Sequence, residues 1–264
     1  MSLQGFTTPR TPTGRASLVP PPPWHYVGDF LVVDFWADPE AATSLLPEGL
    51  EPHPDPGRCA VVFADWQSRS QDGDELVDPV RSQYKEAYLV VNALADGEEV
   101  AYCPFIWVDQ DFAMARGWIQ GFPKKLGTVW MTRAYALDCL AAPGVAAGAR
   151  FGATCSARGR ELVRATVALE GPSAEGSLHT APPIVNVRHF ATLPDRGPAV
   201  HELVQSVSRD RSVSKVWEGA AELAFSPAPG EEHDLLAPVR VGRGYRFTFA
   251  YTVDDLHVRK ELGR

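Results

Sequence analysis

Short runs of β-branched and aromatic residues recur along most of the chain, and they predict strands far more often than helices. The last such run alternates Tyr245, Phe247, Phe249 and Tyr251 with smaller residues, which is typical of a strand with one buried face. Brief connections between many strands favour antiparallel pairing. The predicted strands are 26–36, 58–67, 84–94, 100–108, 128–138, 149–155, 161–169, 181–190, 203–216, 221–225 and 239–253, with 203–216 and 221–225 forming a hairpin-like region.

Two helices and a tight turn interrupt this pattern. The first predicted helix runs from Asp38 to about position 46. Asp38 suits the N-cap, and Pro39 suits the first helical position. A second helix begins near position 110 and ends at Gly121. Asp96-Gly97 predicts a hairpin turn between two strands. The predicted fold class is therefore α+β, mainly antiparallel β with a few short helices.

Length and charge narrow the class of protein. A chain of 264 residues can bury one substantial core, so we predict a single domain over 26–264 behind an extended N-terminal arm over 1–25. The net charge of −8 argues against a surface that binds nucleic acid. No apolar run approaches the ~20 residues that cross a membrane. The first residues also lack the apolar stretch of a secretory signal, so we expect a cytoplasmic protein.

The cysteines and histidines suggest no metal site. Cys59, Cys103, Cys139 and Cys155 are scattered, without a Cys-x-x-Cys pair, and each is expected to be a small reduced core residue rather than half of a disulfide. The seven histidines form no known zinc-binding pattern. We therefore expect neither a structural nor a catalytic metal ion.

Two adjacent lysines, Lys124 and Lys125, stand in an otherwise apolar stretch that includes Trp118, Phe122 and Leu126. Burial disfavours a charged ammonium, as does a neighbouring cation. Both effects increase the share of neutral amine, which is the form that attacks a carbonyl carbon. The stretch therefore indicates a Schiff-base site. The alternative is an exposed basic turn after a helix.

The sequence Gly-Phe-Pro-Lys-Lys-Leu-Gly at 121–127 resembles the signature of the acetoacetate decarboxylase family. Tyr84-Lys85-Glu86 resembles the family's Tyr-x-Glu segment, and the spacing from Glu86 to Asp109 fits the family pattern. Weaker similarity at 34–50 and 213–225 extends the resemblance from about position 30 onward. It implies a mainly antiparallel core that closes into a cone-like β-barrel around the site, and a symmetric homo-oligomer.

The resemblance also implies catalytic roles. Lys124 takes the place of the lysine that forms the imine, and a lysine activated by desolvation or by a second cation is known for acetoacetate decarboxylase itself. Lys125 takes the place of the cationic neighbour, although successive strand residues face opposite sides and Lys125 could instead make a structural contact. Glu86 takes the place of the active-site glutamate, which transfers the protons that imine chemistry requires. The alternative for Glu86 is a surface carboxylate.

Further side chains are candidates for binding the substrate. Arg116 and Gln120 precede Lys124 at intervals of one helical turn and could hold a carboxylate, although a solvated helix face would give the same pattern. Tyr84 lies two residues before Glu86 and could share its face of the strand. Tyr251 could line the same cavity. Either tyrosine could also be an ordinary core residue.

The family pattern is not matched everywhere. The decarboxylases carry a pocket arginine on the N-terminal strand, and its place falls on Trp36, which we therefore expect to face the cavity that holds Lys124. A second glutamate on the next strand falls near Val62, and the family's Gly-Arg-Glu is altered to Arg116-Gly117-Trp118. These changes put decarboxylation of acetoacetate in doubt and leave the imine-forming lysine in place.

Three functions follow as hypotheses. The leading one is a lyase that joins pyruvate, or a similar 2-oxo acid, to an aldehyde by aldol condensation and dehydration through an imine on Lys124. The first rival is decarboxylation of a β-keto acid such as acetoacetate. The second rival is a pocket that binds a small ligand without catalysis.

Overall fold

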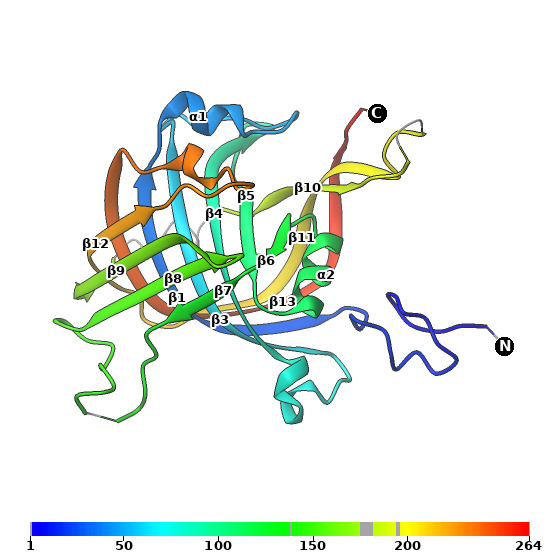
Figure 1. Cartoon of the computed structure of the whole chain (residues 1–264), viewed down its shortest axis with the longest axis horizontal. Helices are drawn as coiled ribbons and strands as arrows, with labels where there is room; N and C mark the ends of the chain where they lie inside the picture. The colour runs from blue at the N-terminus through cyan, green and yellow to red at the C-terminus, as the bar shows by residue number, and fades with distance from the viewer. Residues whose placement is uncertain (1, 138, 175–181, 194–195, 264) are drawn as a thin grey trace.

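The computed structural model describes residues 2–137, 139–174, 182–193 and 196–263. One sheet of thirteen strands dominates the structure, and short helices lie outside it (Figure 1). The helices are α1 (Pro39–Ser44) and α2 (Asp111–Ile119), with 3₁₀ turns η1 (Glu75–Val77), η2 (Pro79–Arg81) and η5 (His233–Leu236). The strands are β1 (Trp24–Trp36), β2 (Glu51–Pro52), β3 (Arg58–Ser70), β4 (Gln83–Ala95), β5 (Glu98–Val108), β6 (Lys124–Leu126), β7 (Thr128–Met131), β8 (Arg150–Ala157), β9 (Arg160–Pro172), β10 (Val185–Phe190), β11 (Val200–Val213), β12 (Trp217–Phe225) and β13 (Arg240–Glu261).

The strands pair mostly antiparallel, as predicted. The hydrogen-bonded order is β6-β5-β4-β3-β1-β13-β12-β9-β8-β7, with β2 on β4, and β11 between β10 and β13. β5 and β6 run parallel, which brings Ile106 opposite Lys124. Within the described residues this order is an open path from β6 to β7, so the closed barrel stays a prediction.

Most predicted elements are present. Asp38 caps α1 by accepting a hydrogen bond from the Ala41 amide at 3.0 Å. The turn between β4 and β5 has left-handed backbone at Asp96 (φ 52°) and Gly97 (φ 81°), as a tight hairpin turn requires.

Two strand predictions need correction. The hairpin-like region is wrong, because β11 pairs with β10 and β13 whereas β12 pairs with β9 and β13. The strand predicted at 128–138 already ends at Met131. Asp138 and Ala181, the end of one predicted strand and the start of another, lie outside the described residues.

The central strands supply apolar groups to both of their faces. Leu31 and Phe35 of β1 pack with Phe63 of β3 in one core, whereas Phe30 and Val32 belong to a second core. Successive strand residues point to opposite faces, so one strand serves both cores. The second core surrounds the site described below.

Three of the four cysteines are buried in the strands, and one is exposed. Cys59, Cys103 and Cys155 are buried free thiols, as expected for strand residues that face a core. Cys139 is exposed, which contradicts the prediction of a core residue. It lies between β7 and β8, outside the strands that form the core.

No helix in the described part of the chain is both long enough and apolar enough to cross a membrane.

Candidate active site

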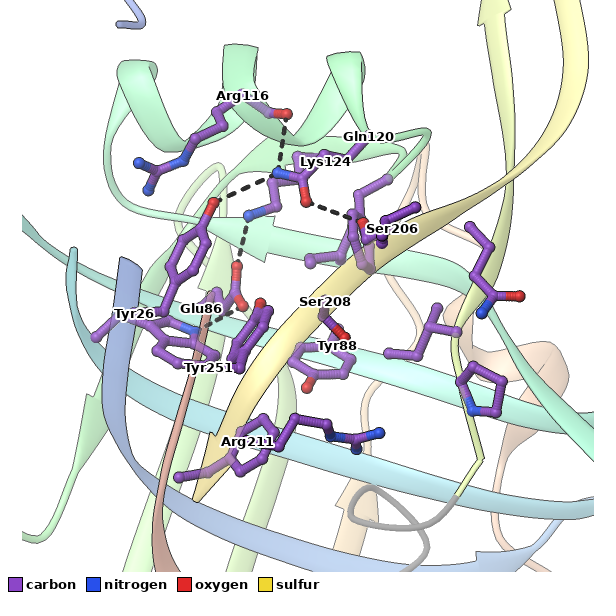
Figure 2. Close-up of a pocket in the computed structure, with 18 of the residues that line it drawn as sticks. Tyr26, Glu86, Tyr88, Arg116, Gln120, Lys124, Ser206, Ser208, Arg211 and Tyr251 are labelled. Atoms are coloured by element: carbon purple, nitrogen blue, oxygen red, sulfur yellow. Dashed lines mark hydrogen bonds and ion pairs between the residues drawn. The ribbon is translucent and has the colours of Figure 1, made fainter. Parts of the chain in front are cut away.

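A cavity of about 530 Å³ opens beside α2 (Figure 2). Strands β1, β3, β4, β5, β11 and β13 contribute to its wall together with α2 and the segment that follows it. Its polar and charged lining comprises Tyr26, Trp66, Tyr84, Glu86, Tyr88, Arg116, Gln120, Lys124, Gln205, Ser206, Ser208, Arg211, Tyr251 and His257. The predicted groups Lys124, Glu86, Arg116, Gln120, Tyr84 and Tyr251 therefore share one cavity.

Lys124 and Glu86 meet because the sheet places them on one face. Glu86 of β4 lies opposite Val108 of β5, and Lys124 of β6 lies opposite Ile106, two residues along the same strand. The Lys124 Nζ donates to Glu86 Oε2 at 2.7 Å, and both side chains are only 7% exposed. The other carboxylate oxygen of Glu86 accepts from the Trp66 indole at 2.7 Å. The surface-carboxylate alternative for Glu86 is thus excluded.

Aromatic rings surround this pair. The Lys124 Nζ lies 5.3 Å from the ring centroid of Tyr84 and 5.8 Å from that of Phe122. Burial raises the pKa values of Tyr84 and Tyr251 well above their usual value, mainly by desolvation. These phenols therefore remain neutral hydrogen-bonding groups at physiological pH. The buried amine also excludes the alternative of an exposed basic turn.

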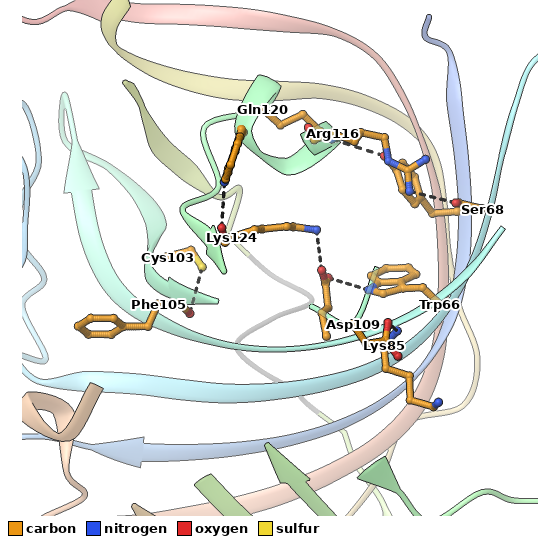
Figure 3. A network of polar contacts seen from close by, with 12 residues as sticks. Trp66, Ser68, Lys85, Cys103, Phe105, Asp109, Arg116, Gln120 and Lys124 are labelled. Carbon is orange, nitrogen blue, oxygen red and sulfur yellow. Dashed lines mark hydrogen bonds and ion pairs between the residues drawn. The ribbon is translucent and has the colours of Figure 1, made fainter. Parts of the chain in front are cut away.

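Arg116 of α2 and Gln120, the C-cap of that helix, line the cavity, and Figure 3 shows Arg116 reaching Ser68. Both are buried, which excludes the solvated helix face. The Arg116 guanidinium lies 4.8 Å from the ring centroid of Tyr26 and donates to Ser68 Oγ at 3.0 Å. The Gln120 amide oxygen accepts from Ser206 Oγ at 3.1 Å, and its nitrogen lies 3.5 Å from the Tyr26 hydroxyl. Polar side chains from the C-terminal end of α2 and its cap thus line the cavity that holds Lys124.

Lys125 lies outside this cavity, which corrects its assignment to the catalytic group. As the next residue of β6, it points to the opposite face of the sheet from Lys124. There its ammonium forms an ion pair with Glu231 and lies 5.7 Å from the ring centroid of Trp107. The structural contact, one of the two alternatives from the sequence, is the one formed.

Trp36 also lies outside the cavity, contrary to prediction. Its indole donates to Asp55 Oδ1 at 3.0 Å, and the Arg240 guanidinium lies 3.3 Å from its ring centroid. Trp36 and Tyr26 share the alternation of β1, but ten residues of strand separate them by roughly 33 Å. The match to the family's arginine thus pointed to Trp36 at the C-terminal end of β1, whereas the cavity residue of β1 is Tyr26, near its N-terminal end. On β3 the cavity residue is Trp66 rather than Val62.

Several cavity residues were not predicted from the sequence. Tyr26 and Trp66 lie in predicted strands, where an aromatic residue most often belongs to the core. Ser206, Ser208 and Arg211 come from β11, far from the motif in sequence. No local pattern distinguishes them, because their role depends on the pairing of β11 with β13.

Gly117 makes room for the side chain of Lys124, and this gives a testable prediction. A Cβ added at Gly117 would lie 2.3 Å from Lys124 Cδ and 2.6 Å from Cε, so Gly117→Ala must displace the lysine side chain. Alanine is also favoured over glycine in a helix interior by roughly 1 kcal/mol. We expect at least tenfold lower turnover with little loss of melting temperature, since a displacement of about 1 Å can cost on the order of 100-fold in rate.

The matched control for this substitution is Gly171→Ala, where an added Cβ meets nothing within 4 Å. It is expected to leave turnover unchanged. Normal turnover in Gly117→Ala would show that the fit against Lys124 is not needed.

Comparisons with known proteins point to one family. Residues 7–262 match the family model described as acetoacetate decarboxylase (ADC). No curated protein matched the chain.

Three solved structures are similar over nearly the full length. The enduracididine biosynthesis enzyme MppR complexed with pyruvate is 35% identical, with a TM-score of 0.92 over 99% of each chain. MppR complexed with the condensation product of pyruvate and imidazole 4-carboxaldehyde is 36% identical, with a TM-score of 0.92 over 98% of this chain and 97% of that chain. An acetoacetate decarboxylase-like enzyme from Sphingomonas wittichii RW1 is 28% identical, with a TM-score of 0.90 over 98% of this chain and 100% of that chain.

Proposed function

Because this chain belongs to the acetoacetate decarboxylase family, we propose that it is a cofactor-free lyase that joins a pyruvate-like 2-oxo acid to an aldehyde. The 2-oxo acid forms an imine with Lys124 and loses a proton to give an enamine. The enamine carbon attacks the aldehyde, and loss of water followed by hydrolysis of the imine releases an unsaturated 2-oxo acid. One 2-oxo acid and one aldehyde thus give one product and one water.

The contact between Lys124 and Glu86 carries this proposal. At 2.7 Å the carboxylate can take a proton from the ammonium and leave the neutral amine that attacks the keto carbon. Glu86 then returns protons to the hydroxyl groups that leave as water. The Trp66 indole holds the carboxylate in place from its other oxygen.

Arg116 of α2 and Gln120, the C-cap of that helix, complete the binding site. The Arg116 guanidinium binds the carboxylate of the 2-oxo acid, and the Gln120 amide donates a further hydrogen bond to it. Tyr84 and Tyr251 limit the space around the reacting carbons and offer neutral hydroxyl groups. The pyruvate and the condensation product in the similar MppR structures support this choice of substrates.

Decarboxylation of a β-keto acid uses the same imine as an electron sink, so it remains the second candidate. The family's name supports it. Trp36 lies outside the cavity, so its difference from the family's arginine does not weigh against decarboxylation. The choice between the two reactions therefore rests on the products that form.

One experiment separates the three functions. The protein is incubated with pyruvate or acetoacetate, reduced with borohydride and mapped by mass spectrometry; in parallel, pyruvate plus benzaldehyde is followed by ultraviolet absorbance and acetoacetate by released carbon dioxide. We expect a pyruvate adduct on Lys124 and a growing absorbance from the conjugated product. Carbon dioxide without that absorbance would indicate the decarboxylase, and no adduct from either acid would indicate a binding protein.

We infer a cytoplasmic homo-oligomer whose single domain, over 26–264, follows an N-terminal arm and closes into the family's cone-like barrel. Size-exclusion chromatography with light scattering tests the oligomer.

A further inference from the structure

The side chain of Gln120 lies between three elements of the cavity wall (Figure 2). Its amide oxygen accepts a hydrogen bond from Ser206 Oγ of β11 at 3.1 Å. Its amide nitrogen lies 3.5 Å from the Tyr26 hydroxyl of β1 and 3.4 Å from the Arg116 carbonyl oxygen of α2. Gln120 is only 7% exposed, so water competes little for these contacts.

The partners of this amide distinguish its two ends. The Arg116 carbonyl oxygen can only accept a hydrogen bond, so it requires the nitrogen end beside it. The Ser206 hydroxyl can donate, and it does so to the oxygen end. Both contacts of the nitrogen are longer than the roughly 2.7–3.2 Å of a normal N–H···O bond, so a charged acceptor is a stronger partner for its hydrogens.

The packing of α2 on β11 explains why Ser206 reaches this amide. Gly121 follows Gln120 with a left-handed backbone (φ 82°), and a Cβ added there would lie 2.7 Å from Val204 Cγ2. The end of α2 therefore lies directly against β11. Val204 and Ser206 are two residues apart on that strand, so their side chains point to the same face, which brings Ser206 beside Gln120.

We propose that Ser206 is a positioning residue for the 2-oxo acid, because its hydroxyl holds the Gln120 amide with the nitrogen toward the substrate carboxylate. This inference rests on the proposed function, and it adds a residue that prepares the site for the first substrate. Without the hydroxyl, the amide oxygen loses its donor and is free to turn toward the carboxylate, which it repels. Ser206 takes no part in the bond changes at Lys124.

The test measures how imine formation depends on pyruvate concentration. The protein is mixed with increasing pyruvate and borohydride, and the initial rate of adduct formation on Lys124 is followed by mass spectrometry. In Ser206→Ala we expect the half-saturating pyruvate concentration to rise about tenfold, on the scale of one hydrogen bond to a charged group. The maximal rate should stay as in wild type, because Lys124 and Glu86 are unchanged.

A double-mutant cycle separates a role through Gln120 from direct contact with the substrate. In Gln120→Ala the amide is already absent, so adding Ser206→Ala should change the half-saturating concentration by less than about twofold.

Ser212→Ala is the matched control for the loss of a hydroxyl. Ser212 is on the same strand, exposed and outside the cavity lining. It should keep the half-saturating pyruvate concentration and the maximal rate of wild type. Melting temperatures of all the variants show that each is folded.

The outcomes separate this inference from the proposed function. The inference would be overturned by an unchanged half-saturating concentration in Ser206→Ala, by an undiminished effect of Ser206→Ala in the Gln120→Ala background, or by an equal loss in Ser212→Ala. In each of these cases the pyruvate adduct would still support the lyase. Absence of a pyruvate adduct on Lys124 in the wild type would overturn both.

Discussion

Replacing Lys124 by alanine is expected to abolish the borohydride-trapped adduct with pyruvate and to lower turnover by at least about 10⁴-fold, on the scale known for loss of an enzyme nucleophile. The substitution removes the amine that bonds to the keto carbon, and no other lysine lines the described cavity. The fold should persist with a lower melting temperature, because Glu86 keeps its hydrogen bond from Trp66 but loses its buried ion-pair partner. Mass spectrometry of the borohydride-reduced protein measures the adduct, and circular dichroism measures whether the variant is folded.

Lys125→Ala is the matched control for that experiment. It removes a lysine from the adjacent position, but from the opposite face, where the ammonium pairs with Glu231. We expect the adduct to form normally on Lys124 and turnover to remain within a few-fold of wild type. An adduct that maps to Lys125, or that survives in Lys124→Ala, would falsify the assignment of the nucleophile.

Replacing Glu86 by glutamine is expected to lower turnover by roughly 10²–10⁴-fold, the usual contribution of a general acid–base group. Glutamine keeps the shape and can still accept from Trp66, but it cannot take a proton from Lys124. Imine formation should slow less than the carbon–carbon step, since solvent can supply some of the earlier proton transfers. Single-turnover trapping and steady-state absorbance separate these two rates.

Glu231→Gln controls for the loss of a buried carboxylate that pairs with a lysine. Glu231 is also largely buried, with its side chain 6% exposed, but it serves Lys125 on the far face of the sheet. We expect a lower melting temperature with near-normal turnover. Wild-type turnover in Glu86→Gln would show that the proton carrier lies elsewhere.

Local pattern was sufficient for the elements that local interactions form. The cap at Asp38, the left-handed turn at Asp96-Gly97 and the end of α2 before Gly121 each depend on neighbours within a few residues. The strands of the first half were predicted because apolar β-branched runs suit a pleated, buried surface. Pairing was less predictable, since the partners of β11 and β12 are set by segments far away in the sequence.

Which lysine faces the site also depends on strand pairing that the local sequence does not predict. The motif places Lys124 and Lys125 next to each other, and alternation along a strand puts one on each face of the sheet. It does not decide which of the two lysines faces the cavity. The choice depended on the parallel pairing of β6 with β5, which puts Lys124 on the face of Glu86.

The sequence by itself therefore determined the mainly antiparallel β class, the family, and a site built from Lys124, Glu86, Arg116 and Gln120, because a contiguous motif and short helical or strand periods carry that information. Only the tertiary structure decided that Lys125 faces away, that Trp36 lies at the wrong end of its strand, and that Arg211 joins the cavity. The physical reason is that side-chain direction, distance along a strand and the meeting of remote strands are set by long-range pairing, which no local pattern encodes.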